Sequence, residues 1–261
     1  MDNTNNKEFW NNYVDYFVNK INEANSECDA KDKTASDIVY EQYFKQLDVK
    51  GNEKLLDFGC GFCRLFPIYE ENMHSEKNVK GGYYGVDVSK RELELAQERY
   101  PRLKLGESLF EYDGLHIPFI DNYFDKIICW GVFDACNQEI IIQELFRILK
   151  IGGKLLVTGK NDKYYEDDEA AKMAEVNARK KGHPNYFTDV HNLTTQLQEH
   201  NIKLDATYYF LRRGDFTRNH AVREMPKIFY EWAYVMEKLE NYKDYEYGKF
   251  SDKYSLMFQK K

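Results

Sequence analysis

Residues 54–66 constrain the fold of this chain more than any other stretch, and they read Lys-Leu-Leu-Asp-Phe-Gly-Cys-Gly-Phe-Cys-Arg-Leu-Phe. The stretch begins as an apolar strand, turns at Gly59 and Gly61, and continues with apolar residues at helical spacing. A strand that leads through a glycine turn into a helix leaves backbone N–H groups free at its carboxyl end, where a ligand can approach closely. Asp57 lies two residues before the first glycine, and its carboxylate suits a cationic ligand group better than a pyrophosphate.

Length and composition limit the classes of protein to consider. A chain of 261 residues with an apolar fraction of 43% can form one large domain or two small ones. The net charge of −7 argues against nucleic acid as a partner, because affinity for nucleic acid depends on Lys and Arg that neutralise phosphates. The polar N-terminus and the lack of a long apolar run predict no signal peptide and no membrane partner. Five cysteines, an odd number, indicate reduced thiols and a cytoplasmic protein.

Strand patterns and helix patterns alternate along the chain, which predicts an α/β fold with a parallel sheet. We expect helices over residues 7–24, 34–47, 63–74, 89–99, 138–150 and 188–200. We expect strands over residues 53–58, 81–87, 103–110, 124–130 and 202–212, another entered at 150–157, and a last one over 254–260. Ser89 is the expected N-cap of the helix that follows the second strand.

A second acid, Asp87, follows the second strand and lies 30 residues after Asp57. An acid at this place in a β-α-β unit can accept hydrogen bonds from both ribose hydroxyls of a nucleotide. The alternative for Asp87 is a solvated aspartate in a turn.

These segments together resemble the class I S-adenosylmethionine (SAM)-dependent methyltransferases. The first motif of that family, an acid followed by x-Gly-x-Gly-x-Gly, is matched by Asp57, Gly59, Gly61, Arg64 and Leu65, while Cys63 replaces the third glycine. Residues 113–125 resemble the adenine-side segment, and residues 150–157 resemble the turn into the fifth strand, with Ile151 in place of a proline. The resemblance covers roughly residues 50–215. It implies a Rossmann-like, seven-stranded, mostly parallel sheet with helices on both faces, in the order 3-2-1-4-5-7-6, with the last strand antiparallel.

The resemblance implies SAM as the cofactor and gives cofactor-binding roles to a set of residues: Asp57, Gly59, Gly61, Asp87, Val88, Asp113, Trp130 and Gly131. Asp87 would bind the ribose, and Asp113 would face the adenine amino group. A second alignment gives the adenine role to Glu107, so both acids stay open, with Asp113 preferred. We expect no metal site.

The whole chain, 1–261, is expected to form one methyltransferase domain. Its parts would be an N-terminal helical cap (1–50), a SAM-binding core (51–160) and two substrate-side insertions (161–187 and 214–251). The insertions leave the carboxyl edge of the sheet, where open α/β sheets bind ligands. The second insertion carries several basic residues, candidates for binding a phosphate or carboxylate or else a solvated face, and an expected helix over 228–239. The N-terminal helices would cover the sheet or form a lid, with Trp10 or Tyr13 touching the ligand.

Two residues are candidates for catalysis. His183 follows a glycine and precedes a proline, and histidine can take a proton near neutral pH. Asp134 lies after the fourth strand, in the loop that is beside the methyl donor in the family. The alternatives are an ordinary loop histidine and an acid that interacts with a helix dipole.

We therefore predict an enzyme that transfers a methyl group from SAM to an oxygen or nitrogen atom of a small-molecule acceptor by in-line displacement. The alternatives are a SAM-binding module without turnover and a methyltransferase that acts on a macromolecule. Cys60 and Cys63 would also fit a redox pair or half of a zinc site. A nicotinamide oxidoreductase is disfavoured because Arg64 stands where its third glycine would be.

Overall fold

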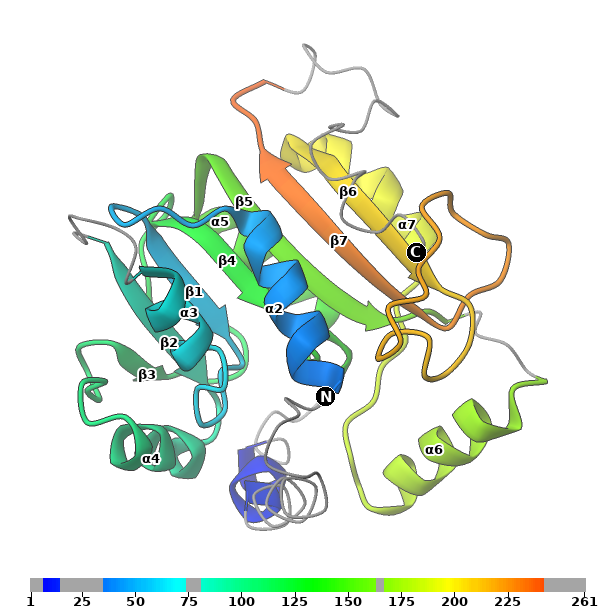
Figure 1. The fold of residues 1–261 in the computed structure, drawn as a ribbon, viewed down its shortest axis with the longest axis horizontal. Helices are drawn as coiled ribbons and strands as arrows, with labels where there is room; N and C mark the ends of the chain where they lie inside the picture. Colours follow the sequence, from blue (N-terminus) through cyan, green and yellow to red (C-terminus); the bar gives the residue numbers. More distant parts are fainter. Residues whose placement is uncertain (1–6, 15–34, 74–80, 163–166, 242–261) are drawn as a thin grey trace.

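The structure is a computed structural model that describes residues 7–14, 35–73, 81–162 and 167–241. Its centre is a seven-stranded sheet in the order β3-β2-β1-β4-β5-β7-β6 (Figure 1). The strands are β1 (Lys54–Phe58), β2 (Gly82–Asp87), β3 (Leu109–Glu111), β4 (Phe124–Cys129), β5 (Leu149–Lys160), β6 (Ile202–Phe210) and β7 (Glu231–Lys238). Only β7 runs antiparallel to its neighbours, β5 and β6. The predicted strand order and the antiparallel seventh strand are confirmed.

Helices pack on both faces of this sheet. The helices are α2 (Ala35–Leu47), α3 (Phe66–Met73), α4 (Lys90–Arg99), α5 (Gln138–Ile148), α6 (Glu169–Lys180) and α7 (Val190–Gln196), with short 3₁₀ turns at Phe133–Ala135 and Leu197–His200. Residues 7–14 are also helical. Side chains of α2, α3 and α4 share one apolar cluster with Leu55, and those of α5 and α7 share another with Leu56. Neighbouring residues of β1 therefore face opposite layers, as the alternation of a strand requires.

One predicted helix is wrong: the apolar run within 228–239 is the strand β7. Its residues alternate between the two apolar clusters, since Trp232, Tyr234 and Met236 join one and Ala233 and Val235 join the other. A strand buried on both faces reads as a continuous apolar run, whose periodicity cannot separate it from a buried helix.

This correction shortens the second insertion. The connection between β6 and β7 covers residues 211–230 instead of 214–251. The predicted last strand over 254–260 lies outside the described residues.

Other element boundaries differ by a few residues. The third strand was expected over 103–110, but it covers only Leu109–Glu111, because Gly106 adopts a positive φ of 80° in a turn before it. Ser89 is the N-cap of α4, as predicted, and its hydroxyl accepts a hydrogen bond from Glu92 N–H. Within the described parts of the chain, no helix combines the length and apolarity needed to cross a membrane.

Candidate functional site

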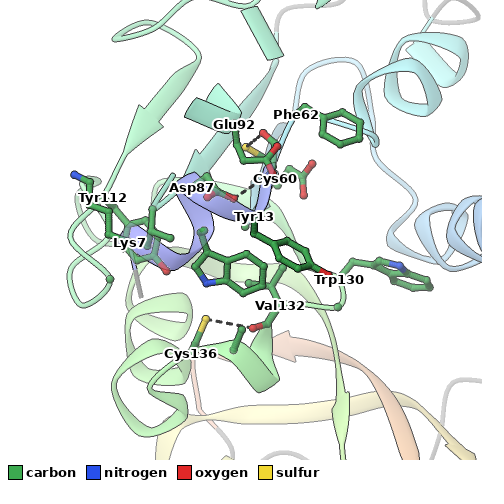
Figure 2. Close-up of a pocket in the computed structure, with 18 of the residues that line it drawn as sticks. Lys7, Tyr13, Cys60, Phe62, Asp87, Glu92, Tyr112, Trp130, Val132 and Cys136 are labelled. Atoms are coloured by element: carbon green, nitrogen blue, oxygen red, sulfur yellow. Dashed lines mark hydrogen bonds between the residues drawn. The ribbon is translucent and has the colours of Figure 1, made fainter. Parts of the chain in front are cut away.

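A cavity of about 300 Å³ lies at the carboxyl ends of β1, β2 and β4, beside helix 7–14 and the loop that carries His183 (Figure 2). Every residue predicted to bind the cofactor lines it: Asp57, Gly59, Gly61, Asp87, Val88, Asp113, Trp130 and Gly131. Glu107 is not among the lining residues. The geometry therefore favours Asp113 over Glu107 as the acid beside a ligand.

The glycine turn after β1 needs its glycines. Gly59 and Gly61 have φ values of 70° and 51°, in the left-handed region that favours glycine. A Cβ atom on Gly59 would lie 2.4 Å from Val132 Cγ1, too close for any side chain. Cys63, which replaces the third glycine of the motif, keeps a left-handed φ of 61°. Cys63 therefore keeps the backbone conformation that a glycine would have at this position, and this conformation costs a cysteine roughly 1–3 kcal/mol.

Asp87 holds this turn in place from the end of β2. Its Oδ2 accepts a hydrogen bond from Gly61 N–H at 2.9 Å, and its Oδ1 accepts one from Ser89 N–H at 2.8 Å. Burial raises the pKa of Asp87, and these backbone donors act in the opposite direction. Both carboxylate oxygens thus already bond to the backbone.

Asp57 lies at the end of β1 and is buried, with only 3% of the residue exposed. Tyr83 donates its hydroxyl to Asp57 Oδ2 at 2.5 Å. Burial raises the pKa of Asp57 to about 7, against the lowering effect of this hydrogen bond. A bound cation would favour the charged form of Asp57, so the site suits a positive ligand group.

Aromatic rings form the wall beside Asp57. Trp130 follows β4, and its ring centroid lies 4.7 Å from that of Tyr40, on α2, and 5.1 Å from that of Phe216. Tyr40 and Trp130 both line the cavity. The sequence analysis missed Tyr40, because its place in a helix pattern indicates only core packing.

His183 also lines the cavity, within a group of aromatic rings from helix 7–14. The centroids of Phe9, Trp10 and Tyr13 lie 5.5, 5.0 and 5.7 Å from the His183 ring. Pro184 O accepts a hydrogen bond from His183 Nδ1 at 2.7 Å. A carbonyl oxygen can only accept, so Nδ1 carries the proton and Nε2 of the neutral ring is free to take one. Burial lowers the pKa of His183, which favours the neutral ring.

Backbone hydrogen bonds attach the His183 loop to the carboxyl edge of the sheet. Tyr186 N–H donates to Asp134 O at 2.7 Å, and Thr188 N–H donates to Lys160 O at 2.8 Å. The side-chain amide of Gln138 donates to Tyr186 O at 2.9 Å. The first insertion therefore reaches the cavity through His183, although it is distant from the glycine turn in sequence.

Asp134 is placed differently from His183. It does not line the cavity, and its Oδ2 lies 3.2 Å from Lys160 Nζ, which also lies 3.2 Å from Glu175 Oε1. A catalytic role for Asp134 stays a prediction, and the geometry favours His183 as the residue beside an acceptor.

The predicted basic cluster of the second insertion does not line the cavity either. Arg213 N–H donates to Asp168 Oδ2 at 2.9 Å, and the Arg223 guanidinium lies 4.3 Å from the Tyr208 ring centroid. Lys7 and Arg64 are the lysine and arginine that reach the cavity from the described residues. Cys60 and Cys63 are both buried and free.

Glu92, on the first turn of α4, is a lining residue that the sequence analysis missed. The residue is 7% exposed, and none of the described residues forms a hydrogen bond with its Oε2. Burial raises the pKa of Glu92 to about 8, with a smaller contribution from the charge of Asp87. In the sequence Glu92 stands out only through the pattern Ser-x-x-Glu at 89–92, and that pattern ordinarily indicates helix capping and not a ligand-binding residue.

Comparisons with known proteins find methyltransferases among the proteins similar to this chain. Residues 56–157 match a family model described as a methyltransferase domain. Methyltransferase GfsG of Streptomyces halstedii is 29% identical over 146 residues, which cover 54% of this chain and 50% of that protein. Demethylmenaquinone methyltransferase of Lactobacillus johnsonii is 29% identical over 117 residues, which cover 44% of this chain and 46% of that protein. The chain thus spans about half the length of the curated relatives that it matches.

A solved structure extends the similarity of the fold over most of the chain. A SAM-dependent methyltransferase of Thermotoga maritima, described as a possible histamine N-methyltransferase, superposes with a TM-score of 0.58. The match covers 88% of this chain and 99% of that one, at 15% sequence identity. At this identity the likeness concerns the fold.

Proposed function

We propose that residues 56–157 form a methyltransferase domain of the class I SAM-dependent superfamily. On this premise, the protein transfers a methyl group from SAM to a small-molecule acceptor. One observation carries the proposal: the cavity is lined both by the predicted cofactor residues and by His183, a histidine with a free ring nitrogen. The cofactor side and the candidate base therefore share one cavity.

The residues of the cavity fit SAM. Gly59 and Gly61 both line the cavity, and Gly61 has no side chain to keep a ligand away from its backbone. When bound, SAM supplies a methyl group on a positively charged sulfonium, ready for in-line attack by a nucleophile. The Asp57 carboxylate and the rings of Tyr40 and Trp130 suit such a positive group. In this proposal Asp87 binds the ribose and Asp113 faces the adenine.

His183 is the proposed general base. Its Nδ1 proton is held by Pro184 O, and its Nε2 takes the proton that a hydroxyl or amine acceptor loses. The edge-on rings of Trp10 and Tyr13 pack against the imidazole and hold it in place. Transfer requires the acceptor atom in line with the methyl carbon, so fixing the base and the acceptor in one cavity supplies much of the rate.

A small acceptor is favoured over a macromolecule. Helix 7–14 contributes Lys7, Trp10 and Tyr13 to the cavity, and this leaves a confined space of about 300 Å³ beside the glycine turn. The name of the Lactobacillus johnsonii relative also indicates a small-molecule acceptor for that protein. We propose oxygen or nitrogen as the accepting atom, because both lose a proton that a histidine can take.

Titration calorimetry tests the cofactor, and a turnover assay tests the reaction. We expect the purified protein to bind SAM and S-adenosylhomocysteine but not NAD, and to convert SAM to S-adenosylhomocysteine with a member of an acceptor panel. Binding of both ligands without turnover on any small or macromolecular acceptor would favour the SAM-binding module. Binding of neither ligand would overturn the proposal.

A further inference from the structure

Glu92 lines the cavity and carries a buried carboxyl oxygen for which the described residues hold no hydrogen-bond partner. The residue lines the cavity next to Asp87 and Gly61, and Figure 2 shows it together with Asp87 and Cys60 at one end of the site. The residue is 7% exposed, and Oε2 has no hydrogen-bond partner among the described residues. A buried polar atom without a hydrogen-bond partner destabilises the folded protein by about 1–3 kcal/mol. A ligand that forms a hydrogen bond with this atom would recover that free energy.

Helix capping does not account for this glutamate. In a capping box the glutamate would accept a hydrogen bond from the backbone N–H of the N-cap residue. Here Ser89 makes its half of the box, because its Oγ accepts from Glu92 N–H at 3.2 Å. The Ser89 N–H donates instead to Asp87 Oδ1 at 2.8 Å, so the Glu92 carboxyl is released from the capping role.

A neighbouring cation does not account for it either. Arg99 opposes the rise in the pKa of Glu92, but its guanidinium lies over the Phe62 ring, 4.5 Å from the centroid. Gly61 faces the Glu92 carboxyl, and a Cβ atom on residue 61 would lie 3.5 Å from Glu92 Oε2. Because glycine has no Cβ atom, the space in front of the carboxyl is open.

The neighbouring acid is already occupied on both oxygens. Asp87 accepts from Gly61 N–H through Oδ2 and from Ser89 N–H through Oδ1. Val88 N–H also acts on Asp87, so about one of its roughly four lone-pair sites is left for a ligand, whereas the described residues place no donor on Glu92 Oε2. A vicinal diol placed at this end of the cavity would have two adjacent acids as acceptors.

We infer that Glu92 is a second ribose-binding residue, whose Oε2 accepts a hydrogen bond from one ribose hydroxyl of the nucleoside cofactor while Asp87 receives the other. The inference rests on the proposed function and adds a specificity-determining residue to it. It explains why a carboxyl group is kept in a buried wall where an apolar side chain would pack without cost.

Binding and stability measured together test this role. We expect Glu92→Leu to weaken the binding of S-adenosylhomocysteine at least tenfold in calorimetry, because the hydroxyl loses its acceptor. The same substitution should raise the melting temperature of the ligand-free protein, because it removes an unsatisfied buried carboxyl. A purely structural role predicts the opposite change in melting temperature. Glu98→Leu, at an exposed position of the same helix, is the matched control and should leave binding unchanged.

Deoxyribose ligands then test which group Glu92 contacts. The loss caused by Glu92→Leu should fall below twofold for either the 2′-deoxy or the 3′-deoxy form of S-adenosylhomocysteine, whichever lacks the bound hydroxyl. An unchanged affinity of Glu92→Leu for S-adenosylhomocysteine, or equal losses with the parent and both deoxy ligands, would overturn the inference alone. A wild-type protein that binds no S-adenosyl ligand would overturn the proposed function and the inference with it. If Glu92→Leu does not fold, Glu92→Met carries the same comparison, because it is an unbranched side chain that removes both carboxyl oxygens.

Discussion

At the scale of single residues, Asp87 joins the structure of the site to its proposed chemistry. The carboxylate fixes the glycine turn through Gly61 and the start of α4 through Ser89. Removing it leaves two backbone donors unpaired and takes away a proposed ribose acceptor. Because a hydrogen bond to a charged group contributes about 1.5–3 kcal/mol, we expect Asp87→Ala to weaken SAM binding by about 10- to 150-fold.

Calorimetry with SAM measures this loss, and Asp87→Asn is the matched control. Asparagine keeps one oxygen as an acceptor, so its affinity should lie between those of the wild type and Asp87→Ala. An unchanged affinity in Asp87→Ala would remove the ribose assignment.

His183 gives a second prediction at this scale. Replacing it with alanine should lower kcat by about 10²–10⁴-fold, the usual contribution of a general base, and leave SAM binding within about twofold. Burial lowers the pKa of His183, so the imidazole stays neutral to a more acidic pH than an ordinary histidine does. The rate should therefore fall on the acid side only below about pH 6.5, as Nε2 becomes protonated.

A pH profile of kcat from pH 5 to 8 measures the position of this acid limb. An acid limb above pH 6.5, or a His183→Ala variant with wild-type turnover, would contradict the assignment of His183 as the base.

At the scale of elements, helix 7–14 forms a wall of the cavity, and the contact of Trp10 with His183 belongs to it. Asn11 Oδ1 accepts a hydrogen bond from Ser89 Oγ at 2.9 Å, so the helix also contacts the N-terminus of α4. An aromatic pair contributes about 0.5–1.5 kcal/mol, and we therefore expect Trp10→Ala to speed the dissociation of S-adenosylhomocysteine about three- to tenfold. Stopped-flow measurement against Asn12→Ala, an exposed position of the same helix, tests it. Equal rates in the two variants would show that the helix does not retain the ligand.

The elements also show how far the sequence could be interpreted. The glycine turn, the N-cap at Ser89 and the strand ending at Asp87 each have a local chemical signature, so their places were predictable. β7 has no such signature, because Trp232 and Val235 face opposite layers and the run between them is apolar throughout. The contact of His183 with helix 7–14 depends on the chain folding back over a long separation, which local patterns do not encode.

At the scale of the whole molecule, the buried acids of the cavity set how stability depends on pH. The pKa of Asp57 is raised to about 7 and that of Glu92 to about 8, mainly by burial, whereas both acids are ionised well below pH 6 in an unfolded chain. Between pH 6.5 and 8 the folded protein therefore binds more protons than the unfolded chain. Stability should fall as the pH rises through this window, with a slope of up to about 1.4 kcal/mol per pH unit for each acid that keeps its proton.

Urea unfolding of the ligand-free protein at pH 6.5, 7.2 and 8 measures this slope. The proton that folded Glu92 keeps contributes stability that is complete below the pKa of an unfolded glutamate, about 4.3, and falls until the pH exceeds about 8. Glu92→Leu should therefore flatten the dependence of stability on pH. The exposed Glu98→Leu should keep the wild-type slope. If stability rises with pH in this window, or if Glu92→Leu and the wild type share one slope, the carboxyl of Glu92 does not hold its proton in the folded protein. SAM carries a positive charge, so its binding should favour the ionised form of Asp57. In the presence of SAM, the stability of the wild-type protein should therefore fall less steeply with rising pH.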